Sequence, residues 1–296
     1  MNKAVIKYSF KLLNADYVKL GSEWNFENVI SPYYRLYYID DGEGVISGPN
    51  DAVELKPGNL YLIPSFTHCN LYCESTLGQY FVQFFEESSD GISLFTNCRE
   101  IFESKADLID IENFKRLIAI NPGRGLERSA DPVVYEKDIY YREFIELNNL
   151  QSAAVQYETQ GIIFQLISKF LKPDIFNRNK QETRPPVVVG AMEYIQRRLG
   201  EPLKVSQLAD RANLSVDYFS KIFHLSTGQS PINYILQKKI ERAQYLITTT
   251  EKQQGEIAEL TGFENVQHFS RVFKRITGLT PGAYKNQNMI PNYADR

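Results

Sequence analysis

The first third of the chain alternates apolar and polar residues in short segments separated by turn residues. The segment YRLYYI is typical: it is rich in aromatic and branched side chains, which favour antiparallel strands. Leu60 and Leu62 alternate with Tyr61 and Ile63, so this strand is expected to bury both of its faces. The pattern up to about residue 98 therefore predicts a β-sandwich or a small barrel.

Beyond about residue 99 the apolar residues recur at helical spacing instead. The clearest helix is expected from Ala154 to Lys172, and Pro173 ends it. Its apolar residues fall mainly on one side: Val155, Ile162, Ile163, Leu166, Ile167, Phe170 and Leu171. The polar, proline-containing stretch 173–186 predicts an interdomain linker, and everything after Pro186 has a helical pattern.

A sequence motif occurs twice in this helical part, at a constant offset. FSKIF at 219–223, TGQSP at 227–231 and Tyr234 recur as FSRVF at 269–273, TGLTP at 277–281 and Tyr284. Two copies are too few for a solenoid, which needs about three or more repeats to bury a core. The duplication predicts two paired small domains.

Each copy has the parts of a helix-turn-helix unit. The expected helices are 205–212 and 216–225 in the first copy, one starting at Ile257 and one over 265–276 in the second, and a connecting helix over 232–248. Ser215 is a favourable N-cap, and Gly262 is a turn residue. The connecting helix is expected to set the separation and phase of the two units, so that two helices enter successive major grooves.

The second helix of each copy is expected to turn polar side chains away from its core. These outward residues are Asp217, Ser220, Lys221, His224, Gln267, His268, Ser270, Arg271, Lys274 and Arg275. Arg and Lys reach guanine acceptors or phosphates, and Gln suits adenine, so this face fits a major-groove reader. The alternative is a polar face that is merely solvated. Recurrence at the same positions of both copies favours DNA contact.

Charge supports the same division of the chain. From Val187 onward there are 14 Lys/Arg against 10 Asp/Glu, and the first 186 residues hold 19 against 26. An acidic front and a basic back suit a protein in which only the back meets phosphate, although basic segments of this size are common.

Cysteine count and apolar runs indicate the compartment. Three cysteines do not make a disulfide framework, and their odd number favours free thiols. No run of 18 apolar residues is present, and the stretch MNKAVIKYSF has neither an apolar core nor a cleavage site. We expect a cytoplasmic protein that has no contact with a membrane.

Residues 187–285 closely resemble the DNA-binding region of the arabinose-regulator (AraC) family. GEIAELTGFENVQHFSRVFKRITGLTPGAYK resembles the family's signature nearly throughout, and QKKIERAQYLI resembles its linker helix. The resemblance implies double-stranded DNA as the partner, with base-facing or phosphate-facing roles for Asp217, Ser220, Lys221, Lys239, Gln267, His268, Ser270, Arg271 and Lys274. Within this set, Lys239 and Lys274 are implied to lie near phosphate. We expect Tyr218, Asn265 and Arg275 to contact DNA as well.

Three features depart from the family's pattern. Asn213 stands where glycine is frequent, Gln254-Gly255 replaces a usual apolar helix start, and Asp217 is acidic on a face expected to meet DNA. Asp217 either accepts a hydrogen bond from cytosine N4 or is repelled, which would leave the second unit dominant.

The front of the chain resembles, more weakly, the cupin-type sensor domain of the same family. VELKPGNLYLIPSFTH matches a strand pair of that domain. The resemblance implies a small-molecule effector, often a sugar. Aromatic and polar residues that we expect to line its site are Trp24, Tyr34, Arg35, Tyr37, His68, Tyr80 and Gln83, and the alternative for each is simple core filling.

The competing function is a cupin-type metal-dependent enzyme fused to a helical domain. Cupin metal sites resemble a set of several histidines and a glutamate, whereas His68 alone stands near such a position. Cys69 and Cys73 near His68 lack a second ligand pair. We therefore expect no metal, no cofactor and no catalytic residues.

These inferences combine into an α+β protein that acts as a sequence-specific transcription regulator, with activation as the expected mode. Its expected parts are a cupin-like β-barrel sensor (1–98), a helical dimerisation segment (99–172), a linker (173–186) and a DNA-binding domain with two helix-turn-helix units (187–290). The expected partners besides DNA are a small-molecule effector, a second copy of the chain and RNA polymerase.

Overall fold

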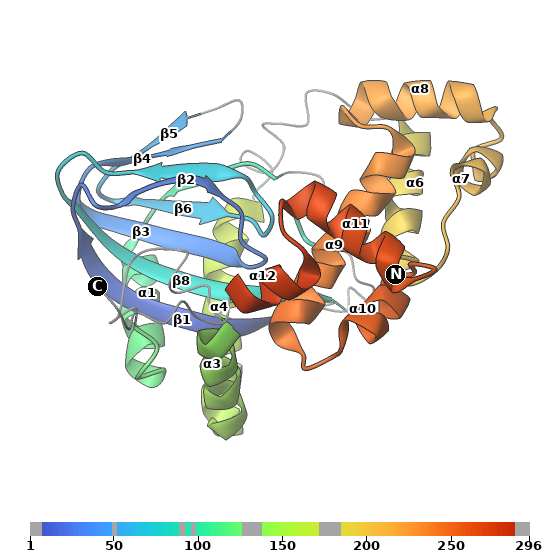
Figure 1. The fold of residues 1–296 in the computed structure, drawn as a ribbon. Coiled ribbons are helices and arrows are strands. Elements are labelled where there is room, and N and C mark those ends of the chain that lie inside the picture. The colour runs from blue at the N-terminus through green and yellow to red at the C-terminus, as the bar shows by residue number, and fades with distance from the viewer. Residues whose placement is uncertain are drawn as a thin grey trace, which may run out of the picture. The chain divides into compact units, whose positions relative to one another are not determined.

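The computed structural model describes residues 8–48, 52–88, 93–95, 99–125, 138–171 and 185–287. The chain divides into two compact units, a β-rich N-terminal one and a helical C-terminal one (Figure 1). Most of the predicted linker, residues 173–184, lies outside the described residues.

The N-terminal unit contains two antiparallel sheets. Its strands are β1 (Tyr8–Leu20), β2 (Asn25–Val29), β3 (Tyr34–Gly42), β4 (Gly44–Ser47), β5 (Ala52–Leu55), β6 (Asn59–Ile63), β7 (Cys69–Tyr72), β8 (Leu77–Ser88) and β9 (Phe102–Lys105). One sheet has the order β1-β8-β3-β6-β9 and the other β2-β7-β4-β5. The pairing therefore confirms antiparallel strands but not a closed barrel, because the described strands leave each sheet with open edges.

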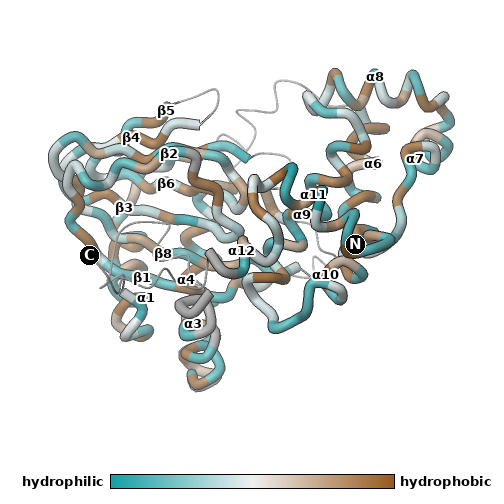
Figure 2. The backbone as a smooth tube through the Cα atoms, in the orientation of Figure 1, coloured by the Kyte–Doolittle hydropathy of each residue, from teal (hydrophilic) through white to brown (hydrophobic). Residues whose placement is uncertain are grey.

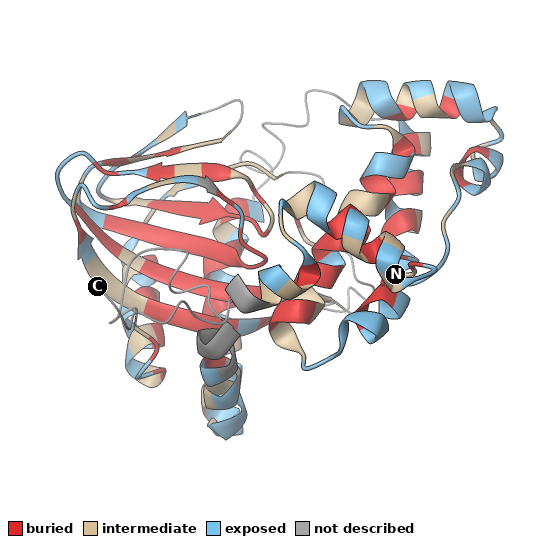
Figure 3. Ribbon diagram, viewed as in Figure 1, coloured by how far each residue is buried: buried red, intermediate tan, exposed pale blue. Residues whose placement is uncertain are grey.

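The larger sheet is buried on both faces, as the NLYLI segment predicts. Leu60 and Leu62 of β6 belong to a core shared with helices, whereas Tyr61 and Ile63 belong to a core built from residues of both sheets. Strands β3, β6 and β8 are buried along most of their length (Figure 3). Successive strand residues point to opposite faces, so one short segment supplies two cores.

Helices cover one face of the larger sheet. They are α1 (Leu108–Ile120), α3 (Asp138–Leu150) and α4 (Ala153–Ser168), and a 3₁₀ turn, η1 (Lys169–Leu171), follows α4 directly. The apolar stripe predicted on this last helix exists, but the sheet covers it: Ile162, Ile163, Leu166, Ile167 and Phe170 are all buried in the core shared with the strands. These five residues are therefore not available for dimerisation, whereas Leu171 of the same stripe is 37% exposed. Dimerisation through the helical segment stays a prediction.

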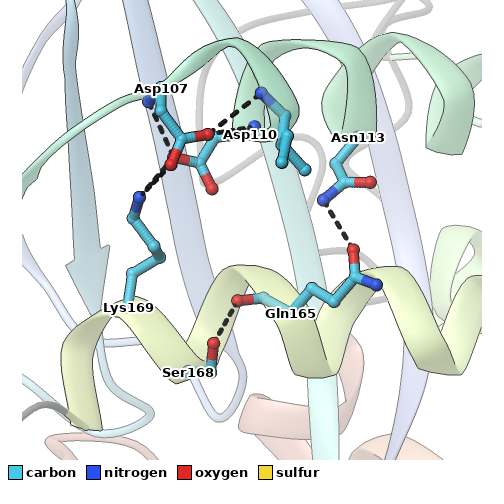
Figure 4. A network of polar contacts seen from close by, with 7 residues as sticks. Asp107, Asp110, Asn113, Gln165, Ser168 and Lys169 are labelled. Atoms are coloured by element: carbon cyan, nitrogen blue, oxygen red, sulfur yellow. Dashed lines mark hydrogen bonds and ion pairs between the residues drawn. The ribbon is translucent and has the colours of Figure 1, made fainter.

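A polar network joins the start of α1 to the end of α4 (Figure 4). Asp107 caps α1 by accepting hydrogen bonds from the backbone N–H groups of Ile109 (2.9 Å) and Asp110 (3.1 Å). The ammonium of Lys169 lies 2.7 Å from an Asp107 oxygen and 2.8 Å from an Asp110 oxygen. Further along α1, Asn113 donates a hydrogen bond to Gln165, which lies one turn before Lys169. The two helices therefore run antiparallel where these contacts join them.

The C-terminal unit is entirely helical in its described part. It contains α6 (Pro186–Arg197), α7 (Val205–Arg211), α8 (Val216–Thr227), α9 (Pro231–Thr249), α10 (Gln254–Leu260), α11 (Val266–Thr277) and α12 (Pro281–Gln287). Apolar and polar residues alternate along these helices, each of which has one face in a core (Figure 2). The predicted helices are confirmed to within a few residues at their ends.

Among the described helices, none combines the length and the apolar character needed to cross a bilayer.

Candidate nucleic-acid interface

The two helix-turn-helix units, α7–α8 and α10–α11, turn in the same way. Asn213 (φ 53°) and Gly262 (φ 66°) occupy the left-handed region directly after the end of the first helix. Asn213 tolerates this conformation better than most side chains, which explains how it replaces the glycine frequent in the family. The second turn is one residue longer, because α11 follows Gly262 by four positions and α8 follows Asn213 by three.

The same capping pattern defines the second helix of both units. The Ser215 hydroxyl accepts from the Tyr218 N–H at 3.3 Å, and Asn265 Oδ1 accepts from the His268 N–H at 2.8 Å. Gly228 ends α8 and Gly278 ends α11, both with positive φ. Glycine adopts this conformation without a steric penalty, so the repeated glycine sets both helix ends.

Matching aromatic clusters hold both helices in place. The ring centres of Phe219 and Phe223 lie 5.7 Å apart, and those of Phe269 and Phe273 lie 5.6 Å apart. The second phenylalanine of each pair also packs on a tyrosine of the next helix, with 5.4 Å between the ring centres. All four phenylalanines are fully buried. Their burial orients the opposite helix face outward, as the sequence predicts.

The outer face of α11 is strongly cationic. Gln267, Arg271, Lys274 and Arg275 are exposed, and His268 and Ser270 are half-buried. The helix contains no acidic residue. Within the described residues, none of its three cationic groups forms an ion pair, so all three are available to phosphate or to base edges.

The outer face of α8 is balanced instead. Asp217, Tyr218 and Lys221 are exposed and Ser220 is half-buried, so α8 presents the residues predicted for it. The fifty-residue offset between the two copies makes Lys221 the equivalent of Arg271. It also aligns His224 with Lys274. His224 is exposed on the predicted outward face, but the resemblance to the family did not add it to the set of DNA contacts. The offset is the sequence signal that would have added His224 to the set.

Lys239 is the exception among the predicted DNA contacts. It is 4% exposed, and its Nζ donates to the carbonyl oxygens of Glu201 (2.9 Å) and Gly262 (2.6 Å). Burial lowers the pKa of Lys239 to about 8. An ammonium held inward by two carbonyls is not placed to contact phosphate, which corrects the phosphate contact expected for Lys239.

The predicted effector residues fall on both faces of the larger sheet. Arg35 and Gln83 are cross-strand neighbours, and Trp24 and Tyr37 belong to the core formed by both sheets. Tyr34 and Tyr80 instead face the helices. Because Tyr34 directly precedes Arg35 on β3, the pleat must send their side chains to opposite faces. His68 is half-buried just before β7.

Arg35 is the most buried charged group of this set, at 1% exposure. Its guanidinium donates to the Ser31 hydroxyl and to Cys69 Sγ (3.7 Å), and it lies 5.6 Å from the centre of the Tyr33 ring. Tyr34 makes separate contacts on the helix side: its hydroxyl donates to Glu86 at 2.8 Å. Burial raises the pKa of Glu86, while the hydrogen bonds from Ser93, Leu94 and Tyr34 oppose that rise.

Cys69 and Cys73, which the sequence places near His68, are both buried free thiols. Cys69 Sγ donates to the Val29 carbonyl and Cys73 Sγ to the Glu43 carbonyl. Burial raises the pKa of Cys73, which favours its neutral thiol form over the thiolate that binds metals. Cys98 lies outside the described residues.

Comparison with known proteins agrees with this geometry. A family model for a helix-turn-helix domain matches residues 208–287. The Msm operon regulatory protein of Streptococcus mutans is 36% identical over 271 residues, which cover 91% of this chain and 90% of that protein. The xylose operon regulatory protein of Escherichia coli is 31% identical over 103 residues, 35% of this chain and 26% of that protein.

Other matches are more local. The chain spans 31% and 44% of the length of two further curated regulators that it matches. A solved Chromobacterium violaceum regulator, described as AraC-type, is 25% identical and covers 36% of this chain and 96% of that one, with a TM-score of 0.33. The relative from Streptococcus mutans, matched nearly from end to end, is the one that establishes the family. This chain belongs to the AraC family of DNA-binding transcription regulators.

Proposed function

We propose that α11 is the dominant base-reading helix and that α8 contributes less to DNA affinity. The observation that carries this proposal is the difference between two equivalent faces: α11 presents Arg271, Lys274 and Arg275 with no acid, whereas α8 has the acidic Asp217 as well as Lys221. Each cationic side chain that binds beside a DNA phosphate releases counterions from the DNA, which favours binding. An arginine can in addition donate two hydrogen bonds to a guanine base.

The test uses the equivalent residues of the two units as matched variants. Binding of the full chain to the promoter beside its own gene, and to a scrambled duplex, is measured by fluorescence anisotropy at low salt. Arg271→Ala is expected to lose about 1–3 kcal/mol of binding free energy and Lys221→Ala less. Equal losses would contradict the dominance of α11, and binding without sequence preference would contradict specific recognition.

We propose further that a small metabolite, with sugars as the first class to test, binds between the two sheets. Arg35 and Gln83 are cross-strand neighbours, and Tyr37 and Trp24 belong to the core formed by both sheets. Together they offer the polar groups and aromatic surface that small-molecule sites combine. One of the relatives above is named for a xylose operon.

Adjacent residues on opposite faces of β3 provide the control for this site. Calorimetric titration with a panel of pentoses and hexoses is expected to detect binding that Arg35→Met abolishes and Tyr34→Phe preserves. Thermal unfolding of both variants checks that the fold persists. Equal loss of binding in both variants would place the ligand elsewhere, and no binding by any sugar would exclude that class.

We propose that the protein acts as a cytoplasmic homodimer through the helical layer of its N-terminal unit, where an effector changes how the dimer presents its DNA-binding parts to promoter and RNA polymerase. Large apolar side chains remain exposed on these helices: Leu108 (81%), Ile109 (69%), Leu150 (82%) and Tyr157 (80%). Joining two DNA-binding units raises their effective concentration on repeated sites, and an effector shifts the arrangement that it binds better.

Sedimentation velocity at micromolar concentration tests the dimer. A Leu108→Glu, Ile109→Glu double variant is expected to sediment as a monomer, because two charges replace apolar surface in the interface. Leu225→Glu, a change at an exposed leucine of α8, is the control and is expected to leave the dimer intact. An unchanged dimer in the double variant would exclude this surface.

A further inference from the structure

The two helix-turn-helix units meet through their backbones, at a seam formed by Gly200–Glu201 and Leu260–Gly262. A Cβ atom placed on Gly262 would lie 2.7 Å from the Glu201 oxygen and 2.8 Å from the Gly200 carbonyl carbon. A Cβ on Gly200 would lie 3.1 Å from the Leu260 oxygen. Glycine at these two positions lets the loop that precedes α7 touch the turn that precedes α11.

Lys239 of α9 closes this seam from the inside. Its Nζ donates to Glu201 O of the first unit and to Gly262 O of the second, at 2.9 and 2.6 Å, and lies 5.4 Å from the centre of the Phe263 ring. One side chain thus bonds both units. Without this lysine, both carbonyl oxygens would lose the donor that they share.

The position of Gly262 connects this contact to DNA reading. Gly262 holds the left-handed turn that precedes α11, and Glu201 lies four residues before Val205, the first residue of α7. A change at the seam therefore alters the direction of α11 relative to α8. Without the seam, α9 alone would leave each helix-turn-helix unit free to rotate about the end of α9 to which it is joined.

We propose that Lys239 is a specificity-determining residue that fixes the separation and rotational phase at which α8 and α11 meet DNA. It thereby selects the spacing between the two base-pair segments that these helices read. The inference rests on the proposed roles of α8 and α11 as DNA readers. The burial of Lys239 and its lowered pKa agree with an internal, structural position.

The first arm of the test measures the free protein, without DNA. In the full chain with Cys98→Ser, spin labels on cysteines at Leu225 of α8 and Glu259 of α10, both exposed, report the distance between the units. Lys239→Met keeps the apolar stem and removes the donors, and Gly262→Ala pushes the seam apart while keeping the lysine. Both variants are expected to broaden or shift the distance distribution, and Lys252→Met, a change at an exposed lysine, is expected to leave it unchanged.

The second arm uses a duplex of about 30 base pairs, roughly three helical turns, selected by the wild-type chain from a random library. One base pair is then inserted between the two segments of the duplex that α8 and α11 read. The wild type is expected to lose about tenfold in affinity, and Lys239→Met clearly less, since its units adapt to the new phase.

The outcomes separate the inference from the proposed function. An unchanged distance distribution in both variants, or an equal insertion penalty in wild type and Lys239→Met, overturns the role of Lys239. If the wild type itself shows no insertion penalty, the proposal that both helices read bases fails, and with it the selection of spacing. The distance arm then still decides whether Lys239 holds the two units together.

Discussion

Asn265 Oδ1 accepts a hydrogen bond from the backbone N–H of His268 at 2.8 Å, which fixes the first turn of α11. Asn265→Ala removes this cap and is expected to lower the free energy of unfolding by about 1 kcal/mol. Asn265→Ser keeps a capping oxygen and is expected to restore most of that stability. Denaturant unfolding of the C-terminal unit within the full chain measures both, and equal stability of the alanine and serine variants would contradict a capping role.

Arg271 and Lys274 are expected to contribute to DNA binding in different ways. Arg271→Ala should relax preference at one base position, whereas Lys274→Ala should weaken all sequences alike and lower the salt slope of binding by roughly one. Affinity measured on single-base variants of the promoter duplex at several salt concentrations distinguishes them. An unchanged base preference in Arg271→Ala would show that this side chain does not read a base.

Phe219 and Phe269 are expected to be equally important for folding, because they are equivalent and both fully buried. Replacing either with alanine leaves a cavity in one helix-turn-helix core and should cost about 3–5 kcal/mol of unfolding free energy. Thermal or denaturant unfolding followed by circular dichroism measures the loss. Leu225→Ala, at an exposed apolar residue of α8, is the control, and a comparable loss there would argue against cavity formation as the cause.

The contact between Asp107 and Lys169 is expected to make the free energy of unfolding depend on pH in the acidic range. The hydrogen bond from Lys169, aided by the backbone N–H groups of Asp110 and Ile109, lowers the pKa of Asp107 from 3.8 to about 2. A carboxyl whose pKa is lower in the folded state stabilises the fold above its unfolded pKa, and this stabilisation is lost as the pH falls from about 4 through about 2.

Asp107→Asn isolates this effect, because asparagine still caps α1 but carries no charge. Its unfolding free energy should vary less than that of the wild type between pH 4 and 2, the interval set by the two pKa values of Asp107. Urea unfolding at each pH gives the comparison. Parallel pH profiles for wild type and variant would show that the ion pair does not contribute.

The sequence by itself determined the helix-turn-helix units, because their information is local. Phenylalanines at helical spacing, a capping residue before each second helix and a glycine after it define a helix and its outward face within a dozen residues, and the repeat shows this twice. The two buried faces of β6 follow in the same way from a period of two.

Tertiary structure alone decided which surfaces are covered. The apolar stripe of α4 looks the same in sequence whether a sheet or a second copy covers it, and only the packing shows that the sheet does. The strand order that leaves two open sheets depends in the same way on pairings between distant segments. Lys239 is the clearest case: its acceptors are 38 and 23 residues away, so no local pattern could reveal that a lysine expected at phosphate is held inside by two carbonyls.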